Sequence, residues 1–64
     1  MILRDFLNLM SLRQKVKVET YLGNKVIYEG FLADSHQFQA MKDDFNRKVD
    51  RISCQDGVVE IEVL

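Results

Sequence analysis

The last third of the chain, residues 47–64, has the most regular pattern of hydrophobic and polar positions. Two extended runs flank Asp56-Gly57, a dipeptide typical of tight hairpin turns, because such a turn needs a positive φ that glycine adopts readily. If Gln55 faces Val58 across the turn, side chains alternate so that one face of the hairpin is apolar and the other polar. A slip by one residue would turn glutamates toward the core, so we predict this register. The apolar face then carries Ile52, Cys54, Val59, Ile61 and Val63, and the polar face carries Arg51, Ser53, Glu60 and Glu62.

Val49 and Leu64 interrupt this alternation, because both fall on the polar face of the predicted hairpin. A bulge near Asp50, or a second contact surface, would account for them. Cys54 falls on the apolar face, where a cysteine usually packs as a small hydrophobic side chain. We therefore expect its thiol to be buried.

Alternation also predicts an earlier hairpin, with strands over residues 16–22 and 26–32. A two-residue loop would pair Leu22 with Lys25 and set charged side chains beside apolar ones. A three-residue loop pairs Leu22 with Val26 and brings the apolar faces together. We predict the three-residue loop, because burial determines register more strongly than turn type does.

The first residues predict a helix over positions 2–12, since their apolar side chains fall in one broad arc at about 100° per residue. The arc is wider than contact with one small sheet requires. We expect the helix to lie flat across the sheet. A second interpretation is that Leu3 and Leu7, or Leu9 and Leu12, extend into a dimer contact.

A second helix is predicted within residues 35–45, where Phe38, Met41 and Phe45 have helical spacing. Asp34 or Ser35 can cap its first turn. A third strand over the same stretch is the alternative. We predict the helix.

These elements predict an α+β fold with the order α-β-β-α-β-β and one four-stranded antiparallel sheet, as a single domain over residues 1–64. A chain of 64 residues forms only a marginal core, with roughly 60% of the unfolded surface buried. One cysteine gives no internal disulfide, so we expect support from self-association as a homodimer or higher oligomer. The phenylalanines expected in or near the core are Phe6, Phe31, Phe38 and Phe45.

Charge is unevenly distributed along the chain. The net charge is −1. Residues 1–32 carry five Lys/Arg and three Asp/Glu, and residues 33–64 carry four and seven. Neither half has the basic stripe of a duplex-DNA binder, and the acidic half suits a basic protein surface. No run is long enough for a membrane span, and with no export signal and one cysteine we expect a cytoplasmic protein.

The polar residues contain no set that predicts catalysis. His36 is the only histidine, and no partner at catalytic or metal-ligand spacing accompanies it, so we expect it at an exposed helix position. Asp43 and Asp44 are expected on a helix surface rather than around a cation. We therefore predict no enzyme, no cofactor and no metal site.

One pattern in the first hairpin is compatible with nucleic acid. Tyrosines and lysines on the solvent side of a hairpin can form a surface on which the bases of single-stranded nucleic acid stack. Such residues are also common there without binding nucleic acid, and we favour this second interpretation. They are Tyr21, Tyr28, Lys15, Lys17 and Lys25.

The first half of the chain resembles the first motif of Sm-like RNA-binding proteins of the Hfq type. The matching residues are Phe6, Leu7, Asn8, Val16, Val18, Tyr21, Leu22, Asn24, Gly30, Gln37 and Phe38. The resemblance implies an N-terminal helix with an Sm/SH3-like small barrel, assembled into an RNA-binding ring. The later Tyr-Lys-His segment of that family is replaced here by residues 48–53, so only Gln37 carries over as a site residue.

A second resemblance spans the whole chain and rests on the order and spacing of short segments. The chain is similar to small uncharacterised proteins of phages and mobile elements of Gram-positive bacteria. The segments are the leucine-rich N-terminus, Gly23-Asn24, residues 26–30 (VIYEG), residues 45–52 (FNRKVDRI), Asp56-Gly57 and residues 58–63 (VVEIEV).

Together these observations predict a non-enzymatic binding protein that occupies a host or phage protein in the bacterial cytoplasm, with counter-defence such as inhibition of a CRISPR effector as one form. An Sm-like RNA-binding oligomer and a structural subunit completed by self-association are the alternatives. The residues expected at the interaction surface are Leu3, Leu7, His36, Gln37, Asp43, Asp44, Arg51, Glu60 and Glu62.

Overall fold

The C-terminal hairpin has the register that the sequence predicts. Strand β3 (Val49–Gln55) is antiparallel to strand β4 (Val58–Val63), with Gln55 opposite Val58 at the turn. Asp56 and Gly57 have φ angles of 54° and 77°. Two consecutive positive φ values define a type I′ turn, whose twist matches that of the strands it joins.

The predicted bulge in this hairpin is confirmed. The register shifts between Val49 and Arg51, so that Val49 rather than Asp50 lies opposite Val63. The extra residue on β3 lets Val49 pack against the core although it is out of phase with the rest of the strand.

The earlier hairpin has a register that differs from both predicted loops. In strands β1 (Lys15–Thr20) and β2 (Val26–Phe31), Val18 lies opposite Tyr28. The Thr20 amide donates to the Lys25 carbonyl over 2.9 Å, so the connection is longer than three residues. From Lys15 to Val18 the expected pairs are shifted by two positions, which keeps these side chains on their predicted faces because strands have a period of two. Beyond Val18 the register slips by one residue, so that Glu19 lies opposite Val26. Ile27 then packs against the core and Val26 is exposed.

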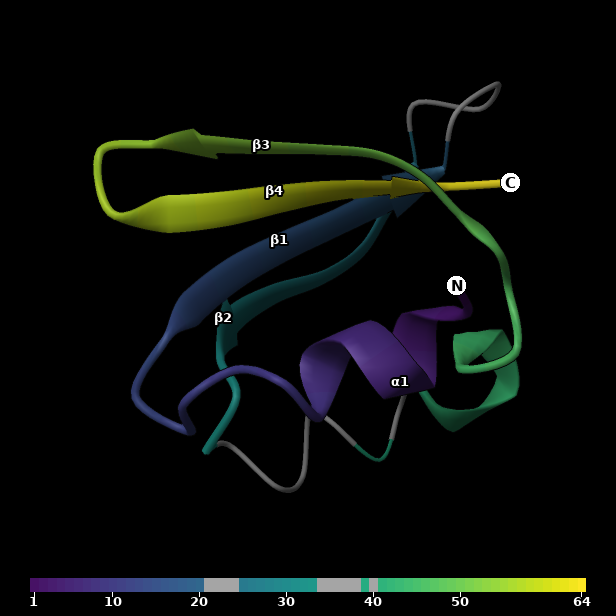
Figure 1. The fold of residues 1–64 in the computed structure, drawn as a ribbon, viewed down its shortest axis with the longest axis horizontal. Coiled ribbons are helices and arrows are strands. Elements are labelled where there is room, and N and C mark those ends of the chain that lie inside the picture. Colours follow the sequence, from purple (N-terminus) through teal and green to yellow (C-terminus); the bar gives the residue numbers. More distant parts are fainter. Residues whose placement is uncertain (21–24, 34–38, 40) are drawn as a thin grey trace.

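The computed structural model describes residues 1–20, 25–33, 39 and 41–64. In Figure 1 the helix α1 (Leu3–Leu7) lies on one side of a four-stranded sheet with the order β2-β1-β4-β3. The chain thus forms one small α+β domain.

The prediction of a purely antiparallel sheet is wrong, because β1 and β4 are parallel neighbours. The two hairpins join through this central pair, so β2 and β3 run in the same direction. The end of β2 at Phe31 and the start of β3 at Val49 therefore lie at opposite ends of the sheet. The Sm/SH3-like barrel is also not formed, since β2 and β3 are the two edges of an open sheet.

The N-terminal helix is present but ends earlier than expected, within Leu3–Leu7. The Leu9 amide donates to the Phe6 carbonyl over 3.1 Å, an i to i−3 bond that tightens the final turn. The Ser11 hydroxyl then accepts the Arg13 amide over 3.1 Å. Such side-chain bonds compete with helix continuation.

The start of α1 is capped by distant backbone rather than by a side chain. Ile2 occupies the N-cap position and offers no side-chain hydrogen bond. Instead, the Leu3 and Arg4 amides donate to the carbonyls of Arg47 and Phe45 over 2.9 and 3.0 Å. The segment before β3 therefore satisfies two of the amides that every helix leaves open at its beginning.

The second predicted helix falls mostly on residues 34–38 and 40, which lie outside the described residues. The described part contains a short 3-10 helix, η1 (Lys42–Asp44), which excludes a strand at this point. Met41 is buried and Phe45 packs against the core. Both face the sheet as their spacing predicted.

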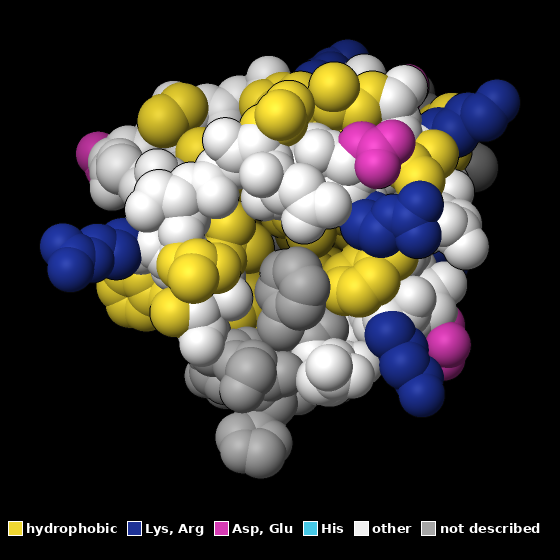
Figure 2. Space-filling model, turned by 60° about the horizontal axis from the view of Figure 1, so that its bottom comes forward, with side chains coloured by type: hydrophobic (Ala, Val, Ile, Leu, Met, Phe, Trp, Pro, Cys, Tyr) yellow, Lys and Arg dark blue, Asp and Glu magenta, His cyan; other side chains and the backbone are white. Residues whose placement is uncertain are grey.

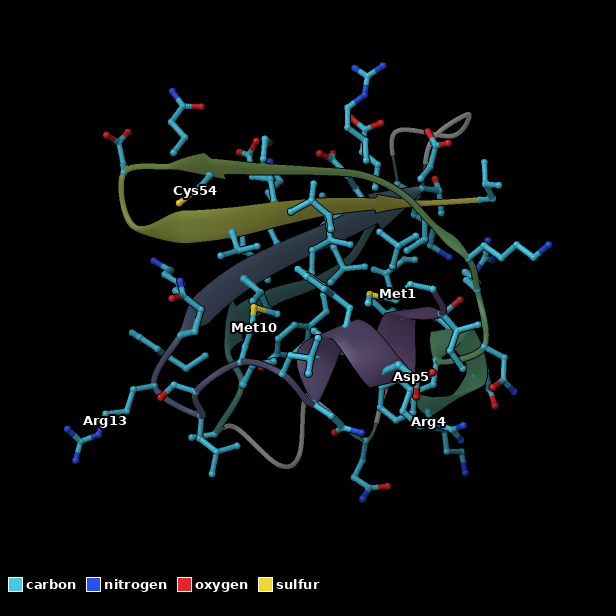
Figure 3. The ribbon with its side chains drawn as sticks, in the orientation of Figure 1. Met1, Arg4, Asp5, Met10, Arg13 and Cys54 are labelled. Atoms are coloured by element: carbon cyan, nitrogen blue, oxygen red, sulfur yellow. The ribbon has the colours of Figure 1, made fainter. Side chains whose placement is uncertain are left out.

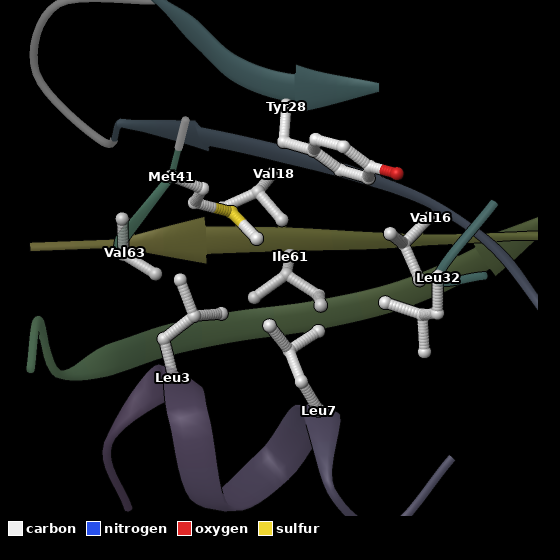
Figure 4. Packing of buried hydrophobic residues seen from close by; sticks show 9 residues of the cluster. All are labelled: Leu3, Leu7, Val16, Val18, Tyr28, Leu32, Met41, Ile61 and Val63. Carbon is white, nitrogen blue, oxygen red and sulfur yellow. The ribbon is translucent and has the colours of Figure 1, made fainter. Parts of the chain in front are cut away.

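The core lies between the sheet and the segments that cross it (Figure 4). The central strands β1 and β4 contribute two fully buried residues each, and α1 contributes its two buried leucines. Of the phenylalanines, Phe6 and Phe45 pack at the edge of the core, whereas Phe31 is exposed and Phe38 is outside the described residues. The buried residues are Leu3, Leu7, Val16, Val18, Tyr28, Leu32, Met41, Ile61 and Val63.

Two isoleucines that face each other across β3 and β4 provide a matched test of this core. Ile61 is fully buried and Ile52 is half exposed. We expect Ile61→Val to lower the free energy of unfolding by about 0.5–1.5 kcal/mol, and Ile52→Val to lower it by less than about 0.5 kcal/mol. Urea unfolding at low protein concentration measures both, and equal losses would contradict this assignment of the core.

The turn provides a second test. A Cβ added at Gly57 would meet nothing within 4 Å, so the cost of a substitution there comes from the backbone alone. We expect Gly57→Ala to destabilise the protein by about 1–2 kcal/mol. Gly57→Asn should lose less, because asparagine tolerates positive φ better. Thermal unfolding of the pair distinguishes backbone strain from a steric clash, which would make asparagine the worse substitution.

Candidate functional site

An open pocket lies beside the end of α1, on the side of the core away from β3. Its volume is about 540 Å³, within the range typical of ligand-binding pockets. We call it the leucine pocket. It is lined by Leu7, Asn8, Met10, Leu12, Leu32, Ala33 and Gln39.

Backbone hydrogen bonds hold the two walls of the leucine pocket together. The Ala33 amide donates to the Leu12 carbonyl over 2.9 Å, and the Leu32 amide donates to the Gln14 carbonyl over 3.2 Å. The segment that follows α1 is thereby joined to the end of β2. The pocket is formed by short-range turns whose positions depend on this long-range pairing.

The leucine pocket has a large apolar side chain exposed at its wall. Leu12, which lines the pocket, is 66% exposed, and Leu9, which lies between the lining residues Asn8 and Met10 in the sequence, is 72% exposed. Figure 2 shows this side of the molecule, where hydrophobic side chains gather in several groups and Lys and Arg side chains stand toward its edges. Exposed leucines next to an apolar hollow are typical of a surface that binds another molecule.

Among the described residues, two polar side chains line the pocket. Asn8 and Gln39 offer amide donors and acceptors at its wall. Figure 3 shows Met10 pointing toward the sheet and Arg13 extending outward from the same loop. Arg13 adds a positive charge directly after Leu12 in the sequence, but it is not among the residues that line the pocket. The described wall therefore combines apolar side chains with two amide side chains.

A second exposed surface follows the edge strand β3. Its residues are exposed from Asp50 to Gln55, including Ile52, which is 47% exposed. In Figure 1 the turn end of the β3–β4 hairpin extends beyond the helix. The inner face of β3 therefore has little covering it.

The expectation that Cys54 is buried is wrong. The residue lies on the predicted face of the sheet, opposite Val59, but its thiol is exposed. Alternation predicts which face a side chain is on, whereas burial requires a second layer over that face. The five-residue helix α1 does not supply that layer at the end of β3.

Two of the expected interaction residues are in the core. Leu3 and Leu7 are buried beneath the sheet, so they cannot form an exposed contact, and the alternative pair Leu9 and Leu12 carries the exposed apolar surface. His36 and Gln37 lie outside the described residues.

The acidic residues expected at the interaction surface take different roles. Asp44 accepts a hydrogen bond from Arg47 Nε over 2.7 Å, so it is engaged within the chain, whereas Asp43 is exposed. Glu60 is half-buried and accepts a hydrogen bond from the Ser53 hydroxyl over 3.3 Å. These contacts reduce the acidic surface that the sequence suggested for a basic partner.

Arg51 and Glu62 lie opposite each other on the outer face of the hairpin, as predicted. Arg51 is exposed and Glu62 is half-buried. Within the sheet Glu62 also neighbours Glu19, so the arginine lies beside a cluster of negative charge.

The stacking platform considered for single-stranded nucleic acid is not formed by Tyr28. Its ring is buried and its hydroxyl donates to the Phe31 carbonyl. Tyr21 lies outside the described residues. Without the Tyr28 face, the lysines of β1 have no described tyrosine beside them on which bases could stack.

Two further observations concern the described residues alone. They contain no group of three His, Cys, Asp or Glu side chains placed to hold a metal ion. They also form no helix with the length and apolar character that crossing a membrane requires.

Sequence reasoning did not identify Met10, Leu32 and Ala33 as residues of one pocket. Leu12 and Ala33 are far apart in the sequence and meet only through their backbone hydrogen bond. The one sequence signal was the excess width of the apolar arc near the N-terminus. It indicated spare apolar surface without locating it.

Comparison with protein-family models, with curated proteins and with solved structures finds no match to this chain.

The reactivity of the Cys54 thiol tests whether the inner face of the edge strand β3 is exposed to solvent. We expect the thiol to react with an aromatic disulfide reagent in the folded protein at nearly the rate seen in denatured protein. Cys54 is the only cysteine, so Cys54→Ser provides the blank. A folded-state rate a hundredfold slower would show that the inner face of β3 is covered.

Proposed function

We propose that this chain is a non-enzymatic binding protein that acts by holding a partner protein at the leucine pocket. The observation that supports this most strongly is the hollow of about 540 Å³ with Leu12 exposed at its wall. Burying a leucine-sized side chain contributes about 1.5–3 kcal/mol. One anchoring side chain of the partner in the pocket would therefore supply a substantial share of the binding energy.

The chemistry of the rim indicates which partner segment fits. The lining is mostly apolar, so the anchor is a large apolar side chain such as leucine, methionine or phenylalanine. Arg13, next to Leu12, favours an acidic residue beside that anchor. Asn8 and Gln39 can hydrogen-bond to the partner's backbone. The preferred ligand is thus a short segment with an apolar anchor and an acidic neighbour.

Action on a host or phage protein in a bacterial cytoplasm, including counter-defence, is the biological form of this proposal. It rests on the sequence resemblance to small phage and mobile-element proteins. A small chain that blocks a partner's surface needs only a preformed anchor site, which the leucine pocket supplies.

Selection from a displayed library of random peptides tests the binding chemistry, whichever protein the partner is. We expect selection on the immobilised protein to enrich peptides with one large apolar residue next to Asp or Glu. Leu12→Ser should weaken the dissociation constant of a synthesised winner at least tenfold, because it removes the apolar rim. Arg13→Glu should reverse the preference for acidic neighbours.

The matched control is Leu64→Ser, since Leu64 is similarly exposed but is not among the residues that line the pocket. Both leucines are at the surface, so their variants should keep the wild-type melting temperature to within a few degrees. Peptides that bind wild type and Leu12→Ser equally well, or no enrichment at all, would contradict the proposed site.

A further inference from the structure

We propose that two copies of this chain associate through their β3 strands, which pair antiparallel about Ile52 and extend the sheet across the dimer. Strand β3 is an edge of the sheet, and an edge strand exposes backbone groups that a second strand can bind. The inference is separate from the leucine pocket and uses a different surface.

The hydrogen-bonding groups of β3 are arranged for such pairing. A type I′ turn makes Gln55 and Val58 a hydrogen-bonded pair, and pairs alternate along an antiparallel ladder. Ile52 and Cys54 are therefore the residues that direct their N–H and C=O groups away from β4. Both side chains are also exposed. The same two residues can therefore form backbone hydrogen bonds and apolar contacts with a partner strand.

The edge has few of the features that usually prevent sheets from joining, and those it has, Asp50, Arg51 and a bulge, lie near its start. Strand β3 contains no proline and no lysine, and its bulge lies at one end, between Val49 and Arg51. Proteins normally protect exposed edges with such residues or with bulges along the strand. The rest of β3 is a regular strand with an open side.

The other edge of the sheet is less suited to pairing. In β2, Gly30 has a φ of 150°, and the carbonyl of Phe31 already accepts the Tyr28 hydroxyl. The register of β2 against β1 is also irregular near Val18 and Glu19. These features disturb the ladder of groups that a partner strand would need.

The charged side chains on and beside β3 favour a second copy of this strand as the partner, and they favour one register of pairing. With Ile52 opposite the partner copy's Ile52, Arg51 of one copy lies opposite Ser53 of the other on the outer face. Ser53 is bound to Glu60, so the guanidinium comes near a carboxylate of the other copy. The twofold axis of the dimer repeats this contact, so the arginine of each copy lies near a carboxylate of the other copy.

The neighbouring registers are less favourable. Centring the pairing on Arg51 would place two arginines directly opposite each other. Centring it on Ser53 would place Asp50 opposite Asp56. Like charges in directly opposite positions destabilise a sheet, so pairing about Ile52 is the register in which these residues do not repel.

The inner face supports the same arrangement. Ile52 lies beside the fully buried Ile61 within each copy. Pairing about Ile52 joins the two isoleucines into one apolar row across the dimer axis. Few residues pair, so the interface is small, and we infer a weak dimer whose population rises with protein concentration.

Mass in solution tests the proposal, by light scattering or sedimentation equilibrium from about 10 µM to about 1 mM. We expect the wild-type mass to rise from 7.5 kDa toward twice that value. Ile52→Lys should weaken dimerisation at least tenfold, because an edge lysine opposes strand pairing. Val26→Lys is the control, since Val26 is 46% exposed on the other edge strand, against 47% for Ile52.

Three results would overturn the proposal: a wild-type mass that stays at 7.5 kDa at the highest concentration, equal dimerisation of Ile52→Lys and wild type, or an equal loss in Val26→Lys. Circular dichroism confirms that each variant is folded before its mass is interpreted. Leu12→Ser should leave the mass unchanged, so failure of the dimer and failure of the leucine pocket are distinguishable.

Cross-linking tests the register. One chain carries Arg51→Cys with Cys54→Ser, and the other carries Ser53→Cys with Cys54→Ser. Since position 51 faces position 53 of the other copy, oxidation should join the two chains only when they are mixed. Disulfide dimers formed by either chain alone would contradict pairing about Ile52.

Discussion

The structure depends on the parallel pairing of β1 with β4. These two strands place Val16, Val18, Ile61 and Val63 side by side with no solvent exposure. Each strand is also one half of a hairpin, so the central pair holds the two hairpins together as one sheet. Because parallel neighbours require a connection that crosses the sheet, this pairing also explains why Leu32 and Met41, which belong to that connection, both lie in the core.

Two polar side chains secure the ends of this arrangement. The Gln14 side-chain amide donates to the carbonyls of Lys15 and Gly57 over 2.9 and 2.8 Å, which joins the start of β1 to the turn of the other hairpin. Arg47 donates to the Leu64 carbonyl over 3.0 Å while its own carbonyl accepts the Leu3 amide. A domain with a small core thus gains order from hydrogen bonds between segments that are distant in sequence.

Both proposed interaction surfaces follow from the small size of the second layer. The five residues of α1 cover the central strands but leave the inner face of β3 open at Ile52 and Cys54. The early end of the helix also turns Leu9 and Leu12 outward, beside the pocket that the chain forms with Leu32 and Ala33.

Local patterns in the chain were sufficient to predict the features that depend on local geometry. Asp56-Gly57 specified a turn with positive φ, and alternation assigned side chains to faces, including the bulge beside Asp50. Which strands are neighbours depends on long-range contacts. A pattern of faces carries no information on strand direction, so the parallel pair was not predicted. Burial also depends on such contacts: Leu3 and Cys54 both lie on apolar faces, yet the first is enclosed and the second is exposed. The leucine pocket also depends on tertiary contacts, since its walls meet through long-range hydrogen bonds that no local pattern encodes.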